Sequence, residues 1–221
     1  MPDDMKGFMR ARMAQEHCDR SISSKEQAAR RWAQRRLGAI QHERRVASIA
    51  TTLFEFTKQM HGLGAAQRRL LRLGAIVHDV GRQIDDRRHP TIGAEMILED
   101  ASLPITQQDR RRLAYLTRYH RGAVPETGFD DILQSGDNRK TMRRVLALLR
   151  AADTLDNRNL TPPQIVMTLK NRRLRVTCFI DEDCEKSRRA FRKRKKFRLM
   201  EDLFDCKIEV QIKLAEAVQT I

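Results

Sequence analysis

The sequence predicts a mainly α-helical protein, α+β overall, in which a bundle of helices carries a small C-terminal β-containing appendage. Apolar residues recur at helical spacing between residue 25 and about residue 154. After residue 160, short runs rich in Val, Ile and Thr are separated by a polar turn, as in a hairpin. Aromatic residues make up only 5% of the chain, so aliphatic side chains must supply most of the core.

The first part of the chain leads into a long helical pattern. Residues 1–24 are polar and mixed, which predicts a loose arm or a short helix, and Ser24 marks the start of a longer helix. The helical pattern runs from about 25 to 60, and its apolar stripe consists of Val46, Ile49, Leu53 and Phe54. His42 lies on this stripe, so its imidazole should point inward. His61 follows at the turn and is expected to be a helix-end residue without a chemical role.

The segment from Leu70 to His89 contains a His-Asp pair at the end of a buried helix. The run before His78 is almost entirely apolar, and Gly81 closes the helix just after Asp79. Taken alone, the pair is compatible with a core histidine beside a helix-end carboxylate. A metal anchor is the alternative, because two ionisable groups at the end of an apolar helix need partners.

Three further ionisable residues occupy comparable places in the helices that follow. His89 stands at the entrance of a helix, because Pro90 suits a first helical turn. His120 falls on the apolar face of a helix predicted at about 106 to 121, and Asp153 falls on the apolar face of the next helix. Imidazoles and carboxylates from separate helices should therefore point into one core.

A shared metal site explains these residues better than separate buried groups do. An isolated buried carboxylate costs several kcal/mol, whereas one or two divalent cations would satisfy the whole set. Mixed imidazole and carboxylate ligands favour Mn²⁺, Fe²⁺ or Zn²⁺ over Mg²⁺ or Ca²⁺. We therefore expect one or two divalent transition-metal ions as cofactors.

The order of these residues resembles the signature of the HD-domain metal-dependent phosphohydrolases, and the resemblance covers most of the chain. It implies a six-residue ligand set, which consists of His42, His78, Asp79, His89, His120 and Asp153. In this arrangement His89 and His120 would complete a second metal site, with Asp79 as the bridge between the two. His42, His78, Asp79 and Asp153 would bind the first metal.

A closer likeness is to the C-terminal half of the exopolyphosphatase and guanosine pentaphosphate phosphatase (Ppx/GppA) family. The segments LTRYH and LRAADTLDNRN are similar to that family's HD-type helical domain, which is followed by a small β-containing tail. The likeness implies an HD-type helical metal-binding domain over 1–160 and a βαβ-like subdomain over 161–221. This sequence shows no counterpart of the family's N-terminal domains, which carry its exopolyphosphatase site, so polyphosphate hydrolysis is not carried over.

The resemblance implies a phosphohydrolase that cleaves a phosphate ester or phosphoanhydride of a nucleotide or small phosphorylated metabolite through a metal-bound hydroxide. Asp79 and Arg82 would be the catalytic residues. Arg82, Arg118 and Arg121 are candidates for binding substrate phosphate, a task that suits guanidinium groups, although a solvated basic rim is the alternative. The six-ligand set is similar to that of diadenosine tetraphosphate hydrolases. No Glu-Asp pair follows at the spacing of alarmone hydrolases and no Gly-Tyr-Pro motif occurs, which disfavours alarmones and cyclic dinucleotides.

The C-terminal part combines a hairpin, predicted at Gln164 to Ile180, with a polybasic helix at 186–198 and a third strand at 207–212. The polybasic helix is either solvent-facing or a binding surface for polyphosphate or RNA. The formal net charge of +15 favours polyanionic partners. The alternative function is therefore a polyanion-binding or regulatory module with a vestigial or structural metal site, and a homodimer stays open.

The remaining features concern the cellular compartment. The four cysteines, Cys18, Cys178, Cys184 and Cys206, show no CxxC spacing, which favours reduced thiols. No segment has the length and apolar character of a signal peptide or a membrane span. We therefore expect a cytoplasmic protein without a membrane partner.

Overall fold

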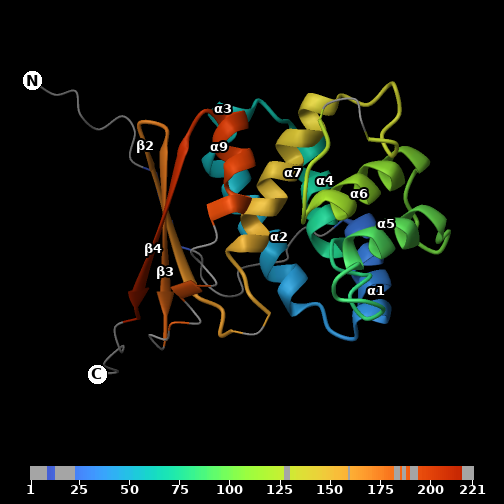
Figure 1. Cartoon of the computed structure of the whole chain (residues 1–221), viewed down its shortest axis with the longest axis horizontal. Coiled ribbons are helices and arrows are strands. Elements are labelled where there is room, and N and C mark those ends of the chain that lie inside the picture. The colour runs from blue at the N-terminus through green and yellow to red at the C-terminus, as the bar shows by residue number, and fades with distance from the viewer. Residues whose placement is uncertain are drawn as a thin grey trace, which may run out of the picture.

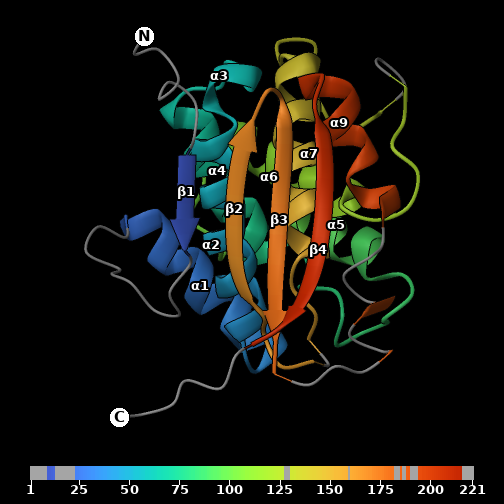
Figure 2. The same ribbon diagram turned by 90° about the vertical axis from the view of Figure 1, so that its left-hand side faces the viewer.

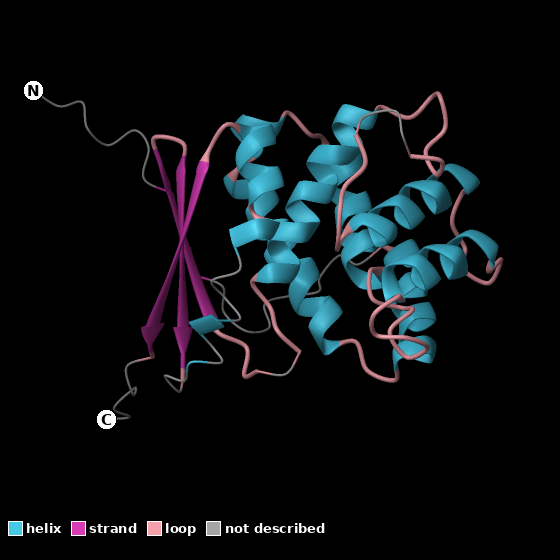
Figure 3. Ribbon diagram, in the orientation of Figure 1, coloured by secondary structure: helices cyan, strands magenta, loops and turns pink. Residues whose placement is uncertain are grey.

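The computed structural model describes residues 9–12, 23–126, 130–158, 160–181, 185, 188–189 and 194–215. Helices fill most of the molecule and a single sheet covers one side (Figures 1 and 3). The helices are α1 (Ser24–Leu37), α2 (Gln41–Phe56), α3 (Lys58–His61), α4 (Ala65–Val77), α5 (His89–Glu99), α6 (Gln107–Tyr119), α7 (Arg139–Thr154) and α9 (Arg198–Phe204). The strands are β1 (Met9–Arg12), β2 (Gln164–Lys170), β3 (Arg173–Ile180) and β4 (Lys207–Leu214). The prediction of a mainly α protein with a small β appendage is confirmed.

The long helical pattern predicted from 25 to 60 is divided into three helices. The first ends at Leu37, and Gly38 follows with a φ of 74°, a left-handed conformation that favours glycine. The second, α2, begins at Gln41 and buries the predicted apolar stripe together with His42. The prediction of one continuous helix was wrong here, because a single glycine within a helical pattern is a weak stop signal.

Three helices run in the same direction and bring their C-terminal ends together. Residues from the first turns of α4, α6 and α7 line one common pocket of about 380 Å³. At their other ends, α4 stops just before His78, α6 stops just before His120, and the last turn of α7 contains Asp153. The negative ends of three helix dipoles therefore meet in one place, which is favourable for a cation.

The sheet has the order β1-β2-β3-β4. The neighbours β1 and β2 are antiparallel, as are β2 and β3, whereas β3 and β4 are parallel. A parallel pair needs a crossover connection, and α9 lies in that connection, as the predicted βαβ appendage requires. The strand β1 was not predicted, because residues 1–24 gave only the expectation of a loose arm or short helix.

One face of the sheet packs on the helices and the other is open. Alternate residues of β3, which are Leu174, Val176 and Cys178, are fully buried and join the same core as Phe204 of α9. Figure 2 shows the outer face toward the viewer, with no described helix or strand in front of it. Of the polybasic segment predicted at 186–198, residues 188–189 and 194–198 are described and the other six lie outside the described residues. Within the described part, Arg194–Lys196 forms a short 3-10 helix and α9 begins at Arg198. Among the described helices, none has the length and apolar composition that crossing a membrane requires.

Candidate metal centre

The structure brings all six predicted ligand residues into one buried cluster. None of them is more than 7% exposed. Their donor atoms form three overlapping groups, each within 4.8 Å, that could hold a metal ion. The groups are His42–His78–Asp79, His78–His120–Asp153 and Asp79–His89–His120. Because Asp79, His78 and His120 each belong to two groups, the cluster is continuous.

Backbone contacts place the two halves of this cluster against each other. His42 comes from the first turn of α2, and His89 is the first residue of α5. The turn after Asp79 packs so closely on α5 that a Cβ added at Gly81 would lie 2.5 Å from the carbonyl oxygen of His89. It would also lie 2.6 Å from the backbone nitrogen of Gly93. Glycine at position 81 therefore sets how close His89 comes to Asp79.

Backbone carbonyls orient three of the histidines. In His78, His89 and His120, the Nδ1 atom lies 2.7–2.8 Å from the carbonyl oxygen of the residue three positions earlier. A carbonyl oxygen only accepts hydrogen bonds, so each Nδ1 carries the proton and donates it. In a neutral imidazole the Nε2 atom then has a free lone pair, and these Nε2 atoms face the cluster.

A carboxylate orients the fourth histidine. Nδ1 of His42 lies 2.5 Å from Oδ2 of Asp156, and Arg45 donates to Oδ1 of the same carboxylate at 2.8 Å. Burial alone would raise the pKa of Asp156, but the hydrogen bonds from His42 and Arg45 lower it. Carboxylates of this kind commonly hold metal-binding histidines in position. Sequence reasoning missed Asp156, which follows Asp153 by three residues and lies just beyond the end of α7.

The donor atoms meet in a way that favours a cation between them. Nε2 of His89 lies 3.1 Å from Nε2 of His120 and 3.0 Å from Oδ1 of Asp79. Nε2 of His42 and Nε2 of His78 are each 3.5 Å from Oδ1 of Asp153. Ligand atoms bound at about 2.1 Å from one ion lie about 3.0–3.4 Å apart, close to these spacings. The residues present thus fit a bound metal.

Two buried atoms of the cluster have no hydrogen-bond partner among the described residues. They are Nε2 of His78 and Oδ1 of Asp79. A buried polar atom without a partner is costly, about 1–3 kcal/mol for a neutral group and more for a charged one. A metal ion would bind both atoms at once, so they are the strongest sign that the cluster is a metal site.

The electrostatics of the cluster agree with this interpretation. Burial lowers the pKa of His120 to about 4, although Asp79 acts in the opposite direction, so the ring is neutral at pH 7. Burial would raise the pKa of Asp79, but His78, His120 and His89 hold it well below its usual range. Burial also disfavours a charged His78, yet Asp79 and Asp153 outweigh it and raise its pKa. The carboxylates are therefore ionised and attract positive charge.

Three cations surround the carboxylates from outside the cluster. Arg82 donates to Oδ2 of Asp79 at 3.0 Å, and Arg158 donates to the same oxygen at 3.0 and 3.1 Å. Lys196 forms an ion pair with Oδ2 of Asp153. Burial lowers the pKa of Arg158 to about 10, which leaves it charged at neutral pH. Of the three, sequence reasoning found only Arg82; Arg158 lay within the family-like LRAADTLDNRN segment and Lys196 within the polybasic one.

The other two predicted phosphate-binding residues are placed differently. The Arg118 guanidinium lies 5.8 Å from the centroid of the Tyr119 ring. Arg121 is exposed. Among the described residues, the side chain of neither arginine forms a hydrogen bond or ion pair with any of the six ligand residues. Their role in phosphate binding therefore stays a prediction.

His61 lies outside the cluster, and both of its ring nitrogens form hydrogen bonds within the fold. It is 1% exposed, its Nε2 donates to the carbonyl oxygen of Phe54 at 2.9 Å, and its Nδ1 accepts from the amide of Leu63 at 2.9 Å. Its ring also packs against Phe54 and Phe204. His61 is thus a structural residue at the end of α3.

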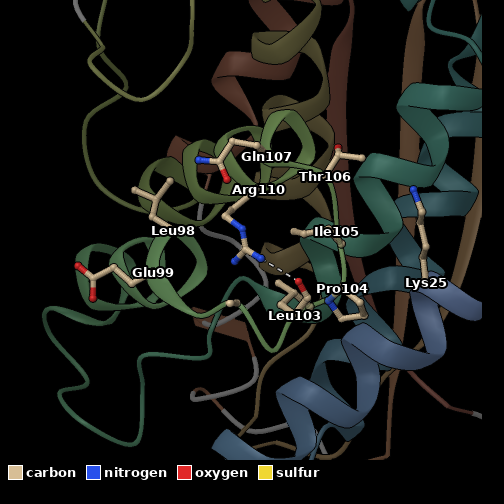
Figure 4. Close-up of a pocket in the computed structure, with 10 residues that line it drawn as sticks. Lys25, Leu98, Glu99, Leu103, Pro104, Ile105, Thr106, Gln107 and Arg110 are labelled. Carbon is tan, nitrogen blue, oxygen red and sulfur yellow. Dashed lines mark hydrogen bonds between the residues drawn. The ribbon is translucent and has the colours of Figure 1, made fainter.

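An open pocket near α5 and α6 is separate from the metal centre. Figure 4 shows Arg110 at its centre, donating to the carbonyl oxygen of Leu103 at 2.8 Å. The same guanidinium also donates to the carbonyl oxygens of Ile97 and Asp100. None of the residues lining this pocket is one of the six ligand residues. Arg110 therefore stabilises the C-terminal end of α5 rather than offering a free charge to a ligand.

Comparison with known proteins adds two findings. The chain is 25% identical over 146 residues to a tRNA (cytidine(56)-2'-O)-methyltransferase from Picrophilus torridus, a match that covers 60% of this chain. It spans only 42% of that curated relative. The family described as Ppx/GppA phosphatase, domain III, matches residues 26–199, a range that includes all six residues of the buried cluster. Because this match covers well over half of its length, the chain belongs to the Ppx/GppA phosphatase family through domain III.

Proposed function

We propose that this protein is a metal-dependent phosphohydrolase of the HD type. Its substrate would be a phosphate ester or phosphoanhydride of a nucleotide or of a small phosphorylated metabolite. The observation that carries the proposal is that four imidazole Nε2 atoms and two carboxylates converge in one buried cluster. Two of these donor atoms have no hydrogen-bond partner among the described residues. The match to a phosphatase family supports hydrolase chemistry.

The six clustered residues would hold one or two ions, with His42, His78, Asp79 and Asp153 at one position and His89 and His120 completing the other. Asp79 lies between these positions, because its Oδ1 faces His89 and its Oδ2 lies 3.8 Å from Nε2 of His42. Manganese, iron or zinc suits this donor set best. When bound, such ions lower the pKa of water to about 7 and polarise phosphate oxygens.

The protein's own cations would position the substrate. Arg82 and Arg158 both donate to Oδ2 of Asp79, so a phosphate group that reaches the cluster on this side would meet both guanidinium groups. Guanidinium binds phosphate oxygens through two parallel hydrogen bonds. Lys196 reaches the cluster from the C-terminal segment and would contribute a third positive charge. The burial of Asp79 and the histidines keeps bulk water away from the reacting centre.

The test is metal analysis of the purified protein, followed by assay of a panel of phosphate esters and nucleoside polyphosphates with Mn²⁺. We compare the wild type with Asp79→Ala and with the control Asp131→Ala, which removes an exposed carboxylate. Asp79→Ala should lose both metal and turnover, and the control should keep both. Metal content that is unchanged in Asp79→Ala would refute the site. Metal binding without turnover on any substrate would favour a structural metal in a polyanion-binding module.

A further inference from the structure

We propose that the outer face of the sheet binds single-stranded RNA. This surface is independent of the metal centre and of the activity proposed for it. In Figure 2 the outer face is turned toward the viewer and no described element covers it. An open sheet face of this kind can accept an extended chain laid across its strands.

The residues of this outer face follow from the alternation of burial and from the strand register. They are Gln164, Val166, Thr168 and Lys170 of β2; Arg173, Arg175, Thr177 and Phe179 of β3; and Lys207, Glu209, Gln211 and Lys213 of β4. Five of them are basic and one is acidic. None of these side chains is buried, whereas their neighbours in β3 point into the core.

Three of the basic residues form a row across one end of the sheet. Lys170 is opposite Arg173, and Arg173 is opposite Lys207. Adjacent strands are about 4.8 Å apart, so three like charges fall within about 10 Å. Like charges directly opposite each other destabilise a sheet. A bound polyanion would remove this repulsion, and RNA phosphates supply the charge of the required sign.

Only part of the positive charge is neutralised within the sheet. Glu209 lies 2.9 Å from Arg173 and 3.5 Å from Arg175, so this single carboxylate is shared by two arginines. No described residue forms an ion pair with Lys170, Lys207 or Lys213. These three lysines are exposed and can contact phosphate groups.

The middle of the face favours RNA over a simple polyphosphate. Its central row contains no charge, because Val166 is opposite Thr177 and Thr177 is opposite Gln211. The next row places Phe179, which is partly exposed, beside Lys213. An aromatic ring can stack on a base, while hydroxyl and amide groups can bind base edges and the ribose 2′-hydroxyl. Polyphosphate has no groups that would use such a surface.

The test measures the binding of a labelled oligouridine of about 12 nucleotides to the full chain by fluorescence anisotropy. EDTA is present, so the metal centre does not contribute. The test variant is Lys170→Gln, Lys207→Gln, Lys213→Gln, and the control is Lys58→Gln, Arg69→Gln, Lys140→Gln, which removes the same charge from exposed positions on the helices. Between about 50 and 200 mM NaCl, loss of three phosphate contacts should lower the slope of log Kd against log salt by about 2. The test variant should bind about tenfold more weakly than the control.

A second variant tests the stacking contact. Phe179→Leu keeps an apolar side chain but loses the ring, so it should weaken RNA binding about fivefold. The slope of log Kd against log salt should stay the same, because no charge is removed. Thermal unfolding of each variant checks that the fold is retained. Equal loss in both triple variants would overturn the proposal, as would binding that neither triple variant weakens. Polyphosphate that competes as well as RNA at equal phosphate concentration, or oligothymidine that binds equally, would overturn the assignment to RNA.

Discussion

Each histidine of the metal centre has one ring nitrogen held by the protein and one turned into the cluster. A carbonyl oxygen holds Nδ1 in His78, His89 and His120, whereas a carboxylate holds it in His42. A carboxylate makes its imidazole a stronger electron donor than a carbonyl does. His42 should therefore be the histidine whose metal binding depends most on a single neighbouring side chain.

Replacing that neighbour tests the dependence directly. Asp156→Asn keeps the shape of the side chain but removes the charge that supports His42 and pairs with Arg45. We expect the affinity for Mn²⁺ to fall about 10- to 100-fold, the usual effect of losing such a partner. Isothermal titration calorimetry with the metal-free protein measures this change. Asp131→Asn is the matched control, and an unchanged affinity in Asp156→Asn would show that Asp156 does not support a ligand.

Sequence patterns predict which side chains point inward, but they do not predict how those side chains are held. Helical spacing placed His42, His120 and Asp153 on apolar faces, and the structure brings them together. Asp156 and Arg158 lie beyond the last regular turn of α7, where spacing gives no direction. Lys196 reaches Asp153 from 43 residues further along the chain, a contact that only the tertiary fold creates.

At the scale of elements, the contact between the turn after Asp79 and the start of α5 controls the geometry of the site. The backbone at Gly81 approaches the backbone of His89 and Gly93 directly, without side chains between them. Backbone atoms cannot rotate away as a flexible side chain can. Any side chain at position 81 must therefore move α5, and His89 moves with it.

Gly81→Ala should consequently weaken both the fold and the metal site. The new Cβ would lie 2.5 Å from the carbonyl oxygen of His89, so we expect the free energy of unfolding to fall by about 1–3 kcal/mol, as in other overpacked sites. Mn²⁺ affinity should fall as well, because His89 moves away from Asp79. Urea unfolding and calorimetry measure the two effects. Gly136→Ala is the control, since its Cβ would meet nothing within 4 Å.

His61 links three elements and gives a prediction about pH. Burial lowers the pKa of His61, which accepts a hydrogen bond from Leu63 and so favours the neutral ring. The unfolded chain binds a proton near the ordinary pKa of about 6.5, whereas the folded chain resists it. The stability that His61 contributes is thus present above that pH and is lost as the pH falls.

The comparison that isolates this contribution is urea unfolding of the wild type and His61→Gln at pH 7 and pH 5. The wild type should be more stable than the variant at pH 7, and the difference should narrow at pH 5. Parallel loss of stability in both proteins would mean that His61 does not titrate on unfolding. Metal content should be the same in both, because none of the contacts described for His61 involves the cluster.

The element boundaries were predictable where caps and breakers are strong and unpredictable where they are weak. Pro90 marked the start of α5, and the turn between the hairpin strands was visible as a polar interruption. The break at Gly38 was missed because the helical periodicity resumes three residues later. The strand β1 was missed because it is defined by pairing with β2, more than 150 residues away, and not by its own composition.

For the whole molecule, the metal centre is a place in the core where negative charge and unpartnered polar atoms are concentrated. Helices α4, α6 and α7 direct their C-terminal ends toward it, and two carboxylates add full negative charge. Lys196 and Arg158 offset this charge only from the outside. The metal-free protein therefore keeps unpartnered polar atoms at the place where several helices meet.

Metal binding should in consequence stabilise the entire fold. At a free Mn²⁺ concentration about 100 times Kd, the free energy of unfolding should rise by about 2.7 kcal/mol, because the ion binds only the folded chain. For a chain of 221 residues this corresponds to an increase in Tm of about 5–10 °C. Differential scanning calorimetry measures the shift, and EDTA should reverse it. Ca²⁺ should give a smaller shift, since it prefers oxygen ligands. Asp79→Ala should show none, and an equal shift in that variant would place the stabilising ion elsewhere in the molecule.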